Sequence, residues 1–337
     1  MFKIFIKCII LLTDIMDFEQ SKSQFLEFSQ SIACDKDRYK FFQWLREEVL
    51  PEFEQSCTTK NERVRRNSDG VQPASVIIDK IAADIRSQLP LDAVLKSENI
   101  IYPTIGDDSN LTSTNTVHVD AFLYDEAAED ALVEDGLLSR SYCKDCGSRN
   151  IEDLTFITHS CSKERLEHMF GSLLPSLSGK TVIDIGSRIG AVLFGAYFYS
   201  AASKIIGIEI NADLCRLQRM IVDKYQLNDR ISVLEGDMCS MAGVIRTGDV
   251  VILNNVFDWF MSPEMQVVMW RFLQSTLTPG VLLVTIPSLQ SSLKSLNTGI
   301  DLSTWVTQLS SPETCSQDQV ETSELCLYQV INCGVST

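Results

Sequence analysis

The sequence predicts an α/β protein built on a doubly wound, mostly parallel sheet. From Thr181 onward, short apolar runs rich in Val and Ile alternate with amphipathic stretches, and polar residues end most of these runs. Continuous apolar runs are typical of parallel strands that helices cover on both faces, and their alternation with helical stretches indicates a doubly wound fold. The predicted strands are 181–186, 204–210, 231–237, 250–255 and 281–288.

Two helices between these strands have clear start signals. One is predicted from Ala212 to Leu227, because Asn211 precedes it and Asn is a favoured N-cap residue. Another is predicted to begin after Ser262, with Pro263 in its first turn, where the fixed φ of proline suits a helix. A last strand is expected in ELCLYQVINC near the C-terminus, with no sheet partner assigned to it.

The residues before the sheet have a different pattern, which predicts an N-terminal helical lobe. Ile78, Ile81 and Ile85 recur at helical spacing, whereas the Ser- and Asn-rich stretch that follows shows no sustained period. The expected segments are an upstream extension (1–16), the helical lobe (17–96), a linker or mobile loop (97–117), a connecting segment (118–160) and a Rossmann-like domain (161–337).

Composition and charge limit the classes of partner and the compartment. With 337 residues and 45% hydrophobic content, the chain can bury a full core. The formal net charge of −16 disfavours direct binding to nucleic acid or to an anionic membrane, since both attract positive surfaces. The eleven cysteines, scattered and odd in number, indicate reduced thiols. We therefore expect a cytoplasmic or nuclear protein.

Polar residues at the strand ends predict a ligand site. In a doubly wound sheet, ligands bind beyond the carboxyl ends of the strands. Asp184 and Gly186 end the first strand, and Gly186 together with Gly190 lets the backbone turn tightly as a ligand approaches the following helix. Glu209 ends the second strand, and its two oxygens suit a pair of ribose hydroxyls.

The third strand ends in residues that suit an adenine ring. Asp237 is an acceptor for an exocyclic adenine amine, and Met238 offers an apolar surface for the ring. The fourth strand ends in Asn254 and Asn255, followed by Phe257.

These stretches resemble the successive motifs of class I S-adenosylmethionine-dependent methyltransferases. The resemblance covers about 160–290, in VIDIGSRIG, IGIEIN, VLEGDM and DVVILNNVFDWF. It implies a class I methyltransferase-like fold with S-adenosyl-L-methionine as cofactor. It also implies that Asp184, Gly186 and Gly190 hold the methionine part, Glu209 the ribose and Asp237 the adenine amine. A nicotinamide cofactor is the weaker alternative, because GSRIG lacks the G-x-G-x-x-G pattern.

Arg188 departs from the family pattern, which usually has a glycine at this position. We expect Arg188 to keep a negative φ, so that its guanidinium reaches the cofactor carboxylate. A positive φ would strain the loop, and a non-catalytic protein that retains the fold stays an alternative.

The fourth motif predicts the reaction. Its NN pair looks like the corresponding loop of the non-SET histone lysine methyltransferases, which implies that Asn254 or Asn255 orients an acceptor amine while Phe257 limits water at the methyl group. The predicted function is methyl transfer to an amine of a protein side chain. A small-metabolite acceptor and an interaction protein are the alternatives. Equally open is that Phe257, Trp259 and Phe260 only seal the sheet edge.

Three cysteines and one histidine between positions 143 and 161 have side chains that can bind zinc. Cys143 and Cys146 have C-x2-C spacing, but His159 and Cys161 are only two residues apart, so the usual second pair is missing. We expect no metal, and thiols buried near a turn.

Overall fold

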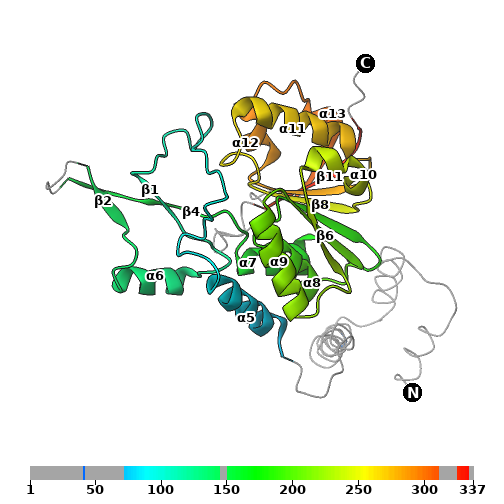
Figure 1. Cartoon of the computed structure of the whole chain (residues 1–337). Coiled ribbons are helices and arrows are strands. Elements are labelled where there is room, and N and C mark those ends of the chain that lie inside the picture. The colour runs from blue at the N-terminus through cyan, green and yellow to red at the C-terminus, as the bar shows by residue number, and fades with distance from the viewer. Residues whose placement is uncertain (1–40, 42–71, 145–149, 311–324, 334–337) are drawn as a thin grey trace. The chain divides into compact units, whose positions relative to one another are not determined.

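The computed structural model describes Phe41 and residues 72–144, 150–310 and 325–333. The expected upstream extension and residues 17–71 of the expected lobe, Phe41 apart, lie outside the described residues. From residue 72 onward the described chain belongs to one compact unit (Figure 1).

The unit is organised around a seven-stranded sheet of order β10-β11-β9-β8-β5-β6-β7. β5 to β9 pair in parallel, and β11 and β10 add two antiparallel strands at one edge. The doubly wound, Rossmann-like arrangement predicted from the sequence is thus confirmed. The strands are β5 (Thr181–Ile185), β6 (Lys204–Glu209), β7 (Ile231–Glu235), β8 (Val250–Asn254), β9 (Leu282–Ile286), β10 (Val306–Ser310) and β11 (Cys326–Val330).

The C-terminal strand β11, for which no partner was predicted from the sequence, pairs within the main sheet. β11 lies between β9 and β10, with Cys326 opposite Thr285. β10 was not predicted.

Helices cover both faces of the sheet (Figure 1). The cap predictions are confirmed: Asn211 Oδ1 accepts from the N–H of Asp213 at 2.9 Å, and Ser262 caps the helix that starts at Pro263. The helices of the unit are α5 (Ala74–Arg86), α6 (Glu126–Glu134), α7 (Lys163–His168), α8 (Ala191–Tyr199), α9 (Ala212–Lys224), α10 (Ala242–Ile245), α11 (Pro263–Thr276), α12 (Leu289–Lys294) and α13 (Leu302–Trp305), with a π-turn η2 (Met169–Leu173) and a 3-10 turn η3 (Met238–Met241).

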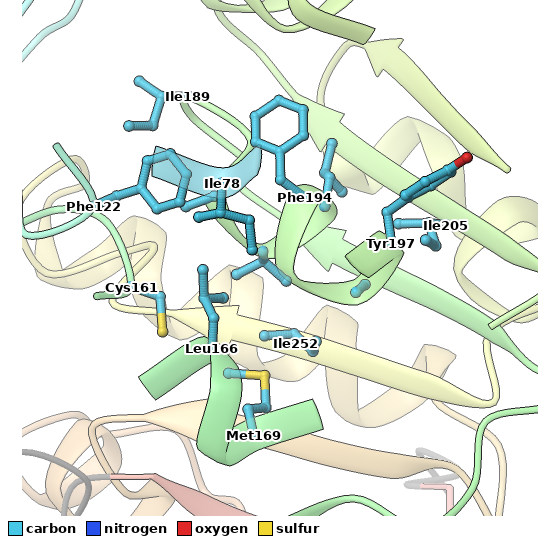
Figure 2. Close-up of a cluster of buried hydrophobic side chains, with 14 of the residues drawn as sticks. Ile78, Phe122, Cys161, Leu166, Met169, Ile189, Phe194, Tyr197, Ile205 and Ile252 are labelled. Carbon is cyan, nitrogen blue, oxygen red and sulfur yellow. The ribbon is translucent and has the colours of Figure 1, made fainter. Parts of the chain in front are cut away.

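Each face of the sheet carries its own core, because successive strand residues point to opposite sides. Val250 and Ile252 of β8 join the core under α5, α7, α8 and α9, whereas Val251 and Leu253 join the core under α11 and α12. Figure 2 shows the first core, in which Leu166 of α7 packs with side chains from α8 and the strands.

α5 packs on the sheet unit itself. Its buried residues Ile78, Ile81, Ala82 and Ile85 belong to the core under α8 and α9, which confirms the predicted apolar face. The following stretch, 97–115, forms neither helix nor strand, and its Ile101 N–H donates to the carbonyl of Trp259 at 2.8 Å. This stretch, predicted as a linker, therefore contacts the loop after β8.

Two small sheets precede the main one. β1 (Thr116–His118) pairs in parallel with β4 (Thr155–Ile157), and β2 (Ser141–Cys143) pairs with β3 (Ile151–Asp153) in antiparallel. Among the described residues, no helix combines the length and the apolar character needed to cross a membrane.

Candidate functional site

The candidate site lies at the carboxyl ends of the parallel strands. From β5 the order runs outward through β6 and β7 on one side and through β8 and β9 on the other, so the winding reverses between β5 and β8. Ligands of doubly wound sheets bind at such a switch point. Asp184 and Asn254 belong to the two strands that flank it, and Glu209 ends the neighbouring β6.

The β5 loop needs glycine at two positions. Gly186 has φ +74°, and a Cβ there would lie 2.1 Å from Cγ2 of Val256 in the β8 loop. Gly190 has φ +88° and is the N-cap residue of α8, where a Cβ would lie 3.0 Å from the ring of Phe194. The two loops at the switch point therefore pack directly against each other, and α8 begins beside them.

Arg188 has φ +46°, so the expectation of a negative φ is wrong. The buried side chain of Gln218 holds this conformation from both sides: its Nε2 donates to the carbonyl of Arg188 at 2.7 Å, and its Oε1 accepts from Ser187 Oγ at 2.9 Å. A left-handed non-glycine residue costs about 1–2 kcal/mol, which the contacts around it must offset.

The Arg188 side chain is held by the segment before the sheet, and this corrects its expected position at the cofactor carboxylate. Nε donates to Glu98 at 3.0 Å, Nη1 to Asp120 at 2.6 Å and Nη2 to the carbonyl of Ala93 at 2.5 Å. The side chains of Arg188, Glu98 and Asp120 are only 7%, 4% and 1% exposed. This buried cluster, the Arg188 network, fastens residues 93–120 to the β5 loop. No sequence pattern predicted this network, because its members lie far apart along the chain.

Glu209 lies beside the same loop. Its Oε2 accepts from the backbone N–H of Arg188 and its Oε1 from that of Asn211, both at 2.8 Å. Burial raises its pKa, against the lowering effect of these two hydrogen bonds. A carboxylate has about four lone-pair positions, so both oxygens retain acceptor capacity beyond the two backbone bonds.

Asp184 is the most strongly perturbed acid among these residues. It is only 2% exposed, and burial together with the negative charge of Glu209 raises its pKa to about 8. The β5 strand end therefore carries a carboxyl group that favours its protonated form near neutral pH.

Asp237 and Met238 lie after β7 in different environments. Asp237 is exposed and caps η3, accepting from the N–H of Cys239 at 2.8 Å. Met238 is buried in the core under α11. Both stay candidate cofactor contacts.

The three residues predicted to act in catalysis lie in different environments. Asn254 ends β8 and is half-buried, while Asn255 has φ +46° and a buried Oδ1 without a hydrogen-bond partner. Phe257 is 3% exposed, and its ring meets Trp270 of α11 edge-on at 5.2 Å. Phe257 therefore belongs to the core, which favours the alternative that this ring seals the sheet edge.

An aromatic cluster that the sequence did not reveal lies next to the β8 loop. His118 Nδ1 and His159 Nε2 are 3.0 Å apart, and the two rings stack at 5.1 Å. The Trp259 ring packs in edge-to-face contact with both imidazoles and with the Tyr102 ring, at centroid distances of 5.3–5.8 Å. Burial lowers the pKa of His118 and brings that of His159 to about 2, so both rings are neutral at pH 7. The spacing of 41 residues between the histidines carries no recognisable pattern.

The two described cysteines of the candidate zinc motif differ in exposure. Cys143 is exposed on β2, contrary to the expectation of a buried thiol, and Cys146 lies outside the described residues. Cys161 is fully buried, and this raises its pKa to about 12. Within the described ranges, no group of three or more His, Cys, Asp or Glu side chains is placed to hold a metal ion.

The comparisons with known proteins give a likeness in fold. No family model matches the chain, and no curated protein matches it. The RNA methyltransferase from Salinibacter ruber, solved with S-adenosyl-L-homocysteine, is similar at 18% identity and a TM-score of 0.36, over 52% of this chain and 96% of that one. An S-adenosylmethionine-dependent O-methyltransferase from Thermotoga maritima is similar at 16% identity and a TM-score of 0.37, over 54% and 69%. Both similar structures are methyltransferases. At these identities and TM-scores, the likeness says nothing of what this chain binds or modifies.

Proposed function

We propose that the chain is an S-adenosyl-L-methionine-dependent methyltransferase. One observation carries the proposal. Asp184, Glu209 and Asn254 lie near the carboxyl ends of three adjacent parallel strands, beside a glycine turn from which α8 begins. Acidic and amide acceptors at a switch point, next to a helix N-terminus, suit a ligand with ribose hydroxyls and a charged tail.

The residues present fit this cofactor in two respects. Glu209 keeps acceptor capacity for ribose hydroxyls, and Gly186 and Gly190 keep the loop backbone bare of side chains at positive φ. Asp184, Asp237 and Met238 complete the proposed set of contacts. Arg188 is removed from it, because its guanidinium is bound to Glu98 and Asp120. When bound, the cofactor supplies a methyl group that its sulfonium already activates.

We assign the acceptor to an amine of a protein side chain. Asn255 Oδ1 is a buried acceptor without a partner among the described residues, at the end of the strand that flanks the switch point. A buried unpaired oxygen costs about 1–3 kcal/mol, and an amine N–H satisfies it. An alignment role of this kind lets the chain speed methyl transfer without acid–base residues. The net charge of −16 also suits a basic partner.

Isothermal titration of the full chain with S-adenosylmethionine, S-adenosylhomocysteine and NAD tests the cofactor. Saturable binding of the first two supports the proposal, while binding of NAD alone overturns it. Radiolabelled methyl transfer then separates acceptors: label in lysate proteins supports the protein amine, and label only in small-molecule extracts assigns a metabolite instead.

The Arg188 network favours a second candidate, an interaction protein that retains the fold without turnover. The glycine position of the loop holds a left-handed arginine, and the buried ion pairs tie residues 93–120 to the loop. If this candidate is right, S-adenosylmethionine, S-adenosylhomocysteine and NAD all fail to bind, and no radiolabelled methyl group is transferred.

A further inference from the structure

A cavity of about 450 Å³ lies outside the strand-end site, among residues 90–138. It is within the size range of small-molecule sites in proteins, about 300–1,000 Å³. Its lining includes the apolar residues Leu91, Val117 and Leu138 and the hydroxyl residues Ser113 and Thr116. The cavity therefore combines the apolar surface and the few polar groups of a binding site.

The lining of the cavity carries an acidic residue and no Lys or Arg among the described residues. Among the described residues that line it, Asp92 is the only acidic one, and burial lowers the pKa of the lining His118. Asp92 Oδ1 accepts from the N–H of Val94 at 3.1 Å, so the carboxylate is oriented by its own turn. None of the described lining residues is Lys or Arg, and Asp92 is exposed, so a cation from solvent can reach its carboxylate.

Aromatic rings also line the cavity. Tyr102 and the neutral His118 line the cavity, and their rings are 6.3 Å apart. A ring face attracts an organic cation, and a carboxylate strengthens that attraction. Apolar walls accept the methylene stem that carries such a cation.

We infer that this cavity binds an alkylammonium group, the chemical class of a lysine side chain. The cavity also adjoins the candidate active site: Tyr102 and His118 both pack edge-on against Trp259, in the loop that follows Asn254 and contains Asn255. That the ammonium group belongs to the methyl-transfer substrate rests on the proposed function. That the cavity binds an ammonium ion does not.

Titration of the full chain with n-butylammonium tests the cavity without any cofactor. Saturable binding is expected, with pentanoate, of similar length and opposite charge, binding at least ten-fold more weakly. Asp92→Asn preserves the acceptor for Val94 and removes the charge, so it should weaken n-butylammonium binding several-fold. Asp107→Asn removes an equal charge from an exposed residue of the same segment outside the lining and should leave the affinity unchanged.

A second pair of variants tests the aromatic wall. Tyr102→Phe keeps the ring and should bind n-butylammonium like the wild type, whereas Tyr102→Leu should bind it several-fold more weakly. Equal binding of n-butylammonium and pentanoate, or an Asp92→Asn variant that binds like the Asp107→Asn control, overturns the inference.

Further arms identify the source of the ammonium group and separate the two proposals. An acetylated, amidated lysine peptide that competes with n-butylammonium, while its norleucine counterpart does not, identifies a protein side chain. Competition only by free amines identifies a metabolite. If n-butylammonium binds but S-adenosylmethionine does not, the cavity stands and the methyltransferase proposal fails. The reverse result retains the enzyme and removes the cavity.

Discussion

Replacing Arg188 by glycine tests the main departure of this chain from its expected pattern. The substitution removes a cation that is 7% exposed and leaves the carboxyl groups of Glu98 and Asp120, which are 4% and 1% exposed, without their partner. Breaking a buried ion pair costs about 3–5 kcal/mol. Glycine adopts the left-handed φ of +46° without strain, which offsets about 1–2 kcal/mol of that loss in the free energy of unfolding. The net loss in the free energy of unfolding is therefore about 1–4 kcal/mol.

Urea unfolding of the full chain measures this loss. The matched control is Arg219→Ala, which breaks the exposed pair with Glu235, whose side chains are 43% and 45% exposed, and should cost no more than about 1 kcal/mol. Adding Asp120→Asn to Arg188→Gly should recover part of the loss, because the uncompensated charge is then gone. An Arg188→Gly variant as stable as the wild type would refute the reasoning.

Three further predictions concern the strand-end site. Glu209→Gln should weaken S-adenosylmethionine by about 1.5–3 kcal/mol in titration calorimetry, since the amide loses charge-assisted acceptors; an unchanged affinity removes Glu209 from the site. Asn254→Ala and Asn255→Ala should leave cofactor affinity near wild type, and at least one should slow methyl transfer about 10- to 1000-fold; normal turnover by both defeats the alignment role. In the folded protein the pKa of Asp184 is raised to about 8, so the folded state holds this proton more tightly than the unfolded state does. The resulting stabilisation is complete below the unfolded-state pKa and is lost as the pH rises towards 8. Asp184→Asn should accordingly flatten the fall in melting temperature between pH 5 and pH 8, and a wild-type slope in that variant contradicts the assignment.

The strands and helix caps were predictable because their causes are local. The apolar run that ends at Asp184 and the cap at Asn211 depend on residues within a few positions, and the structure places both as expected. The strand ends also predicted where polar side chains gather, since parallel strands share one carboxyl edge.

The surroundings of Arg188 and His118 were not predictable in the same way. Arg188 contacts Glu98 and Asp120 across the fold, and His118 meets His159 through the pairing of β1 with β4. Neither contact produces a spacing in the sequence. The position of Phe257 depended on which way the β8 loop turns, which the aromatic composition of the loop left open.

The Arg188 network has a consequence for the order in which the chain folds. Its hydrogen bonds join Arg188 to residues 95, 90 and 68 positions earlier, at Ala93, Glu98 and Asp120. Closing loops of this length costs entropy before any contact is gained, whereas β5 and β6 come together over a shorter stretch of chain. We therefore expect the bonds to Ala93 and Glu98 to form after β5 and β6 have paired, so that loss of the guanidinium accelerates unfolding more than it slows refolding.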